Sequence, residues 1–235
     1  NERPEFILGM VRTGTTMASY LMDSDPATRS LLRWEAYNVA PPAAPGMTRT
    51  DERCLAEKAT DEQMIKGNPE GVATHFEPAD GPTECVHLVA QDFRSMMFTA
   101  LSTTPVYADW ILHCDMGSAF EHRKSRLIFN KHMDPDYMRC KWPLQLSLHL
   151  RRPLELAQER PNDIYHLYYD EMMADPIGQM KKVYGWLGDA WTAAAESGMK
   201  KWLEENPQGR FGKHAYSLNE WGFTKKELEP YFADY

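Results

Sequence analysis

The chain has 235 residues, of which 43% are hydrophobic and 26% charged, and its formal net charge is −8. That hydrophobic content can form one packed core, and proline and glycine do not gather into a linker, so we expect a single domain over residues 1–235. The acidic balance argues against a nucleic-acid partner. No apolar run approaches the ~20 residues that cross a bilayer, and no secretory pattern opens the sequence, which favours a cytoplasmic protein.

The first predicted elements are a strand, a turn and a helix. Phe6-Ile7-Leu8 is typical of a short buried strand, and a helix is predicted from Thr15 onward, to end near residues 23–26. Between them, Gly9 and Gly14 have the G-x-x-x-x-G spacing of a phosphate-binding loop, whose backbone N–H groups face an anion. Thr15 replaces the lysine of nucleotide hydrolases, and Arg12 brings the positive charge inside the loop. The alternative is an ordinary strand-turn-helix corner.

The loop Gly-Met-Val-Arg-Thr-Gly-Thr-Thr, residues 9–16, resembles the G-x-P-R-S-G-T-T loop of one enzyme family. These are the sulfotransferases that use 3′-phosphoadenosine 5′-phosphosulfate (PAPS), particularly the bacterial branch related to tyrosylprotein sulfotransferases. The resemblance implies that five residues of the loop bind the 5′-phosphosulfate of the donor. They are Arg12, Thr13, Gly14, Thr15 and Thr16.

A second strand is predicted within residues 28–36, with Glu35 at its far end. In a parallel sheet this carboxylate would lie at the same edge as the loop. A Leu-Trp-Glu segment follows the loop in the family, so the resemblance implies that Glu35 takes the proton of the acceptor. The alternative is an exposed loop residue. His75 and Glu84 could line an acceptor pocket, although a loop histidine and an acid near a helix start are commoner explanations.

Helices are predicted farther along the chain. Residues 50–66 show helical spacing, with Leu55, Ala59 and Ile65 on the expected inner face. Residues 92–129 are rich in methionine and aromatic residues, which predicts helical core; the alternative is the wall of a cavity for a bulky apolar acceptor. An amphipathic helix is expected over residues 177–187.

Two later segments extend the resemblance. A strand is predicted to end at Lys141, and Pro143 is suited to begin a helix. The family has this Lys-x-Pro segment, which implies that Lys141 holds the bridging oxygen of the donor. The closing Gly-Lys-His-Ala-Tyr-Ser-Leu segment resembles the family's G-K-H-x-Y-S-L, which implies that Lys213 and His214 help to enclose the nucleotide. The alternatives are a surface lysine and ordinary tail residues.

The resemblance breaks between these segments. The family has a strand ending in arginine and a serine-bearing helix that grip the 3′-phosphate, whereas Arg151-Arg152-Pro153 does not match. Residues 164–176 resume the pattern, with a buried strand and a helix capped near Asp175. We therefore expect the natural polypeptide to contain further residues near 149–152 that the printed sequence lacks. The alternative is a true deletion in an inactive relative.

The predicted fold is an α/β, P-loop-like three-layer domain with a short parallel sheet flanked by helices. The resemblance implies a sulfotransferase that moves a sulfuryl group from PAPS to an alcohol or phenol, with a small-molecule or lipid acceptor. Positive side chains are expected to serve without a metal, and the separated cysteines predict reduced thiols: Cys54, Cys85, Cys114 and Cys140. The alternatives are a P-loop kinase or nucleotide hydrolase, and a non-catalytic nucleotide-binding relative. Acceptor identity and oligomeric state stay open.

Overall fold

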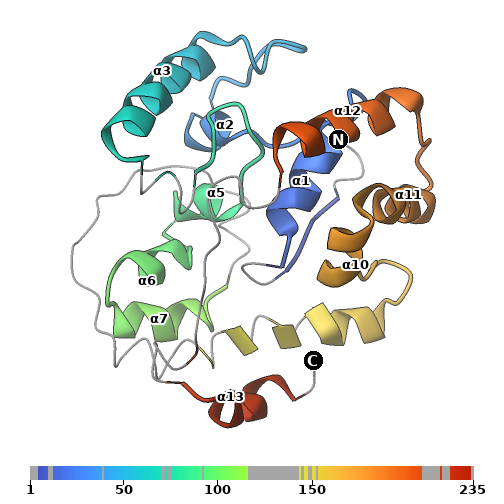
Figure 1. Cartoon of the computed structure of the whole chain (residues 1–235). Coiled ribbons are helices and arrows are strands. Elements are labelled where there is room, and N and C mark those ends of the chain that lie inside the picture. The colour runs from blue at the N-terminus through green and yellow to red at the C-terminus, as the bar shows by residue number, and fades with distance from the viewer. Residues whose placement is uncertain are drawn as a thin grey trace. The chain divides into compact units, whose positions relative to one another are not determined.

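The computed structural model divides the chain into two compact units. The first unit comprises Asn1–Ser30 and Arg139–Tyr235, and the second comprises Leu31–Met138. The structure describes residues 5–9, 13–38, 40–69, 72, 76–91, 93–115, 143, 146, 147, 150, 151, 153–207, 218 and 223–233. Helices make up nearly all of the regular structure in these ranges (Figure 1).

The predicted α/β fold with a parallel sheet is wrong for the residues that the structure describes. Their only β-type pairing is an isolated antiparallel bridge between Leu32 and Pro82. The first predicted strand has no regular secondary structure, and Phe6 and Leu8 are 74% and 67% exposed. Residues 164–168 likewise form no strand. Because a strand depends on paired neighbours and a buried face, a short apolar run alone does not make one. The strand predicted to end at Lys141 lies outside the described residues.

The second predicted strand, within residues 28–36, is also wrong, because the chain from Arg33 onward forms helix α2 (Arg33–Tyr37). A short apolar run fits a strand or a helix, and packing decides between them. Trp34 and Ala36 are both fully buried at 0% exposure. The indole N–H of Trp34 donates to the carbonyl oxygen of Thr48 at 2.8 Å, which fixes this helix in the core of the second unit.

The described part of the first unit contains a helical stretch over residues 153–159 and five helices with defined bounds (Figure 1). They are α1 (Thr15–Asp23), α10 (Tyr169–Ala174), α11 (Pro176–Leu187), α12 (Ala193–Glu205) and α13 (Lys225–Phe232). Helix α1 packs on α12, α12 on α11, and α11 on α10. Their buried core contains Ala18, Leu21, Met172, Met180, Tyr184, Ala195 and Met199. The helices predicted from residue 15 and over residues 177–187 are confirmed.

Close packing and caps hold these helices in place. A Cβ atom on Gly198 of α12 would lie 2.1 Å from the carbonyl oxygen of Ser24, so only glycine allows this approach to the end of α1. The Asp175 carboxylate accepts the N–H of Gly178 at 2.9 Å, which confirms the predicted cap of α11. The Tyr184 hydroxyl donates to the buried Asp25 at 2.7 Å, joining α11 to the turn after α1.

In its described residues the second unit contains α2 and further helices with defined bounds. These are α3 (Glu52–Gly67), α5 (Val86–Ala90), α6 (Met97–Leu101) and α7 (Pro105–Ile111). The predicted helix over residues 50–66 is confirmed, but its predicted inner face is wrong: Leu55 and Ile65 are 52% and 41% exposed. Cys54 and Asp61 are buried instead. The reason is that Asp61 turns inward to contact Arg33 and the backbone N–H of Ala79.

Three of the four cysteines lie in the described ranges and are free thiols, as predicted. Cys140 lies outside those ranges. Within the described part of the chain, no helix has the length and hydropathy of a membrane span.

Candidate functional site

The loop before α1 depends on two glycines. Gly14 has φ +85°, a left-handed conformation that favours glycine, and a Cβ atom there would lie 3.1 Å from the Tyr169 ring. A Cβ atom on Gly9 would lie 2.6 Å from Thr15 Cγ2 and 2.9 Å from Thr13 Oγ1. Gly9 therefore lies close against Thr13 and Thr15 at the start of α1, where a larger residue would collide.

This loop leads to a helix end that no side chain caps. The first hydrogen bond within α1 runs from the N–H of Ala18 to the Gly14 carbonyl oxygen at 3.0 Å. The N–H groups of Thr15, Thr16 and Met17 precede that bond, and the first turn contains no acidic residue. Such a helix end carries the positive part of the helix dipole together with N–H donors, so it can bind an anion.

The structure describes only part of the predicted donor site. Helix α1 begins with Thr15 and Thr16, and Thr13 and Gly14 directly precede it. Four predicted donor-binding residues lie outside the described residues: Arg12, Lys141, Lys213 and His214. The pocket candidate His75 also lies outside them, and Glu84 is exposed.

Glu35 lies in α2 and is partly buried, so the alternative of an exposed loop residue is wrong. Its Oε2 accepts the backbone N–H of Leu32 at 3.2 Å. An acid at the third position of a helix commonly closes the first turn in this way. The carboxylate therefore has a structural role in α2.

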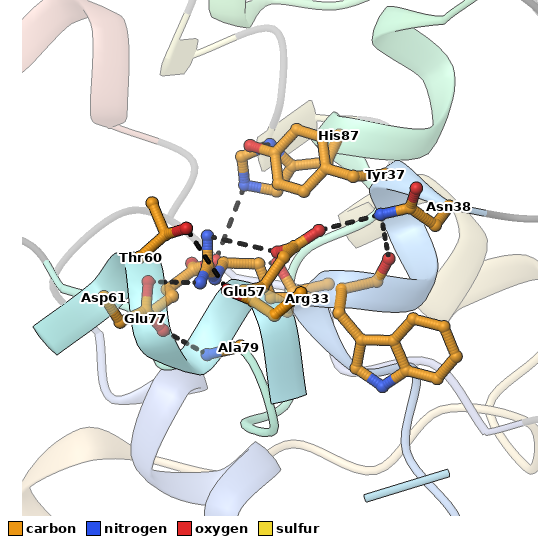
Figure 2. Close-up of polar contacts among 12 residues, drawn as sticks. Arg33, Tyr37, Asn38, Glu57, Thr60, Asp61, Glu77, Ala79 and His87 are labelled. Carbon is orange, nitrogen blue, oxygen red and sulfur yellow. Dashed lines mark hydrogen bonds and ion pairs between the residues drawn. The ribbon is translucent and has the colours of Figure 1, made fainter. Parts of the chain in front are cut away.

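A network of polar side chains, here called the polar cluster, joins α2 to α3 and α5 (Figure 2). Its members come from α2, α3, the segment before α5, and α5 itself: Arg33, Tyr37, Asn38, Glu57, Asp61, Glu77 and His87. No local sequence pattern predicted this cluster.

One half of the polar cluster is an ion pair between α2 and α3. Arg33 Nη2 lies 2.5 Å from Asp61 Oδ1, and Arg33 Nη1 lies 3.6 Å from Glu57 Oε2. The other Asp61 oxygen accepts the N–H of Ala79 at 2.8 Å. Asp61 is only 6% exposed. Removing one partner of such a buried pair costs about 3–5 kcal/mol, so this contact fixes the position of α2.

The other half of the polar cluster is a chain of three ionisable side chains. The Tyr37 hydroxyl lies 3.0 Å from His87 Nδ1, and His87 Nε2 lies 3.5 Å from Glu77 Oε2. The hydroxyl of Thr83 donates to the same Glu77 oxygen at 2.6 Å. Burial raises the pKa of Tyr37, while the Arg33 charge opposes that shift. Tyr37 therefore holds its proton at neutral pH.

An open apolar cavity of about 530 Å³ lies beside α7, in the region where an acceptor cavity was the alternative to helical core. Its lining residues are Thr104, Pro105, Val106, Tyr107 and Trp110. The opposite side of the same helix contributes Ala108 and Ile111 to buried packing, so the predicted helical core is confirmed for this helix. Phe93 and Trp110 are 47% and 44% exposed, and residues 116–129 of the predicted core lie outside the described residues. Helix α7 thus has one packed side and one side along a cavity.

The chain is similar to known sulfotransferases. A model of the sulfotransferase family matches residues 4–151. The crystal structure of sulfotransferase STF9 from Mycobacterium avium has 31% sequence identity and a TM-score of 0.80, covering 99% of this chain and 76% of that chain. Sulfotransferase STF1 from Mycobacterium tuberculosis H37Rv is similar in fold, with a TM-score of 0.77, 22% identity, and coverage of 99% of this chain and 77% of that chain. No curated protein matches the chain significantly.

Proposed function

The chain belongs to the sulfotransferase family, and we propose that it transfers a sulfuryl group from PAPS to the hydroxyl of an alcohol or phenol. The observation that carries the choice of donor is the uncapped start of α1 behind a tight loop with two glycines. Thr15 occupies the position where nucleotide hydrolases have their lysine, which favours a donor other than ATP or GTP.

The proposed donor contacts follow from this loop. The N–H groups of residues 13–16 would bind the 5′-phosphosulfate together with Arg12. Lys141 would hold the bridging oxygen, on which negative charge develops as the bond to sulfur breaks, and Lys213 and His214 would enclose the nucleotide. Sulfuryl transfer resembles phosphoryl transfer in being an in-line displacement, so positioning and charge stabilisation supply most of the rate.

Glu35 is the proposed base for the acceptor hydroxyl. Its carboxylate is fixed on α2 by the contact with Leu32, and α2 is itself fixed by the ion pair between Arg33 and Asp61. A base held on a rigid element can be positioned for proton transfer. Replacement by glutamine keeps the shape but removes the basicity, so Glu35→Gln should lower turnover by about 10²-fold or more with little change in donor affinity.

Isothermal titration calorimetry tests the proposal that PAPS is the donor. The chain should bind adenosine 3′,5′-bisphosphate more tightly than ATP with Mg²⁺. Arg12→Ala should weaken that binding by about 10-fold or more, because a hydrogen bond to a charged group is worth about 1.5–3 kcal/mol. Arg29→Ala is the matched control, since Arg29 is an exposed arginine of the same unit. Preference for ATP with Mg²⁺, or unchanged affinity in Arg12→Ala, would contradict the assignment.

A further inference from the structure

The ring of Tyr169, the first residue of α10, lies against Gly14 at the start of α1. A Cβ atom on Gly14 would lie 3.1 Å from Cδ2 and 3.6 Å from Cε2 of that ring. One edge of the ring therefore fills the space that a larger residue at position 14 would need. Both residues belong to the first unit, so the contact lies within one compact body.

Helix α10 is anchored on both sides, which sets the position of this ring. Met172 is 2% exposed and belongs to the same buried core as Leu21 of α1. Residues three apart share a helix face, so Tyr169 lies on the side of α10 that carries Met172. Gln179 Nε2 of α11 donates to Glu171 Oε2 at 3.0 Å. Burial and this hydrogen bond together hold α10 in place.

The conformation of Gly14 sets the direction of the first anion-binding N–H group. Its φ of +85° and ψ of 9° are left-handed, and its carbonyl oxygen accepts the N–H of Ala18 at 3.0 Å. The N–H of Thr15 belongs to the peptide group that follows Gly14, so a rotation of the Gly14 backbone turns this group directly. Glycine adopts many backbone conformations when nothing restrains it. An unrestrained Gly14 would have to be ordered each time an anion binds.

We propose that Tyr169 is a positioning residue for the sulfuryl donor. Its ring edge holds Gly14 in the left-handed conformation and so directs the N–H groups of Thr15 and Thr16 toward the 5′-phosphosulfate. The inference rests on the proposed binding of PAPS. Ring carbons make the contact with Gly14, so the Tyr169 hydroxyl is not required for this role. The ring raises donor affinity because it removes an ordering cost from the binding step.

Isothermal titration calorimetry with adenosine 3′,5′-bisphosphate tests this role. Tyr169→Ala should weaken binding by about 10-fold, which is the cost of ordering the backbone of one residue. Tyr169→Phe keeps the ring edge and should bind within about twofold of the unmodified chain. Tyr168→Ala is the matched control and should also stay within about twofold. Tyr168 is the adjacent tyrosine, 63% exposed, and its ring stacks on that of His166.

A second nucleotide separates positioning of the loop from direct contact with the nucleoside. Adenosine 3′-phosphate has no 5′-phosphate for the loop to bind, so Tyr169→Ala should bind it as the unmodified chain does. Circular dichroism checks that the variant is folded. Tyr169→Leu, which keeps apolar bulk beside the core, takes its place if it is not, and should lose affinity for the bisphosphate in the same direction.

Three results would overturn the positioning role. They are unchanged affinity for adenosine 3′,5′-bisphosphate in the folded variant, an equal loss with both nucleotides, and a loss in Tyr169→Phe as large as in Tyr169→Ala. Failure of the proposed function is a separate result, because the unmodified chain would then not bind adenosine 3′,5′-bisphosphate at all. That result would remove the role of Tyr169 as well.

Discussion

At the scale of single residues, Gly14 offers a direct test of the loop geometry. An alanine in the left-handed conformation costs about 1–2 kcal/mol, and its Cβ atom would also lie 3.1 Å from the Tyr169 ring. We expect Gly14→Ala to lower the free energy of unfolding by at least that amount, measured by urea denaturation.

Gly185 provides the matched control for this substitution. It lies inside α11, and a Cβ atom there would meet nothing within 4 Å. Gly185→Ala should therefore stabilise the chain by about 0.5–1 kcal/mol, because alanine is the better helix former. Equal effects of the two substitutions would contradict the left-handed conformation of Gly14.

At the scale of elements, Glu196 of α12 joins two helices of the first unit. Its carboxylate contacts Lys200 at 2.6 Å and Lys181 of α11 at 3.0 Å, and accepts the indole N–H of Trp191 at 2.9 Å. The hydrogen bonds from Lys200, then Trp191 and Lys181, lower the pKa of Glu196 to about 2. Because the folded-state pKa is depressed, this carboxylate stabilises the fold above its unfolded pKa.

The lowered pKa of Glu196 determines how the stability should change with pH. Glu196→Gln should be less stable than the unmodified chain at neutral pH. The difference should shrink as pH falls below the unfolded value of about 4.3 and should vanish near the folded pKa of about 2. Glu204→Gln, an exposed position on the same helix, is the control. A stability difference for Glu196→Gln that persists unchanged in acid would show that the ion pairs do not produce it.

The elements also show what the sequence could predict. Helices α1, α3 and α11 follow from spacing, caps and turn residues over 9, 16 and 12 residues. The Phe6-Ile7-Leu8 segment is too short for a pattern of alternating residues to identify a strand. Whether such a segment pairs with another strand depends on residues far away in the sequence. The loop of residues 9–16 was recognisable because its two glycines have a fixed spacing.

The polar cluster was not predictable in the same way. Arg33 and Tyr37 are four residues apart, as are Glu57 and Asp61, so each pair visibly shares one helix face. Nothing local indicates that these two faces meet, because the contact between Arg33 and Asp61 spans 28 residues. The sequence also did not indicate that His87 contacts Tyr37 and Glu77.

At the scale of the whole molecule, the match with the Mycobacterium avium sulfotransferase STF9 includes 99% of this chain but only 76% of that protein. Between Lys141-Trp142-Pro143 and Tyr168-Tyr169-Asp170 the sequence has no room for the strand and serine-bearing helix that the resemblance implies for the 3′-phosphate. We predict that intact mass spectrometry of the natural protein will give more than the 27.1 kDa of the printed sequence. A mass of that value would support a true deletion, and would weaken the proposal of an active enzyme. The single domain over residues 1–235 remains a prediction.

Sulfuryl transfer from PAPS is tested most directly by following both products of one reaction. The chain is incubated with PAPS and a panel of alcohols and phenols, without added metal, and the nucleotide and acceptor products are separated by chromatography. We predict that adenosine 3′,5′-bisphosphate and a sulfated acceptor form in equal amounts, and only when an acceptor is present. Intact PAPS with every acceptor, together with hydrolysis of ATP in the presence of Mg²⁺, would contradict the proposed reaction and favour a nucleotide hydrolase.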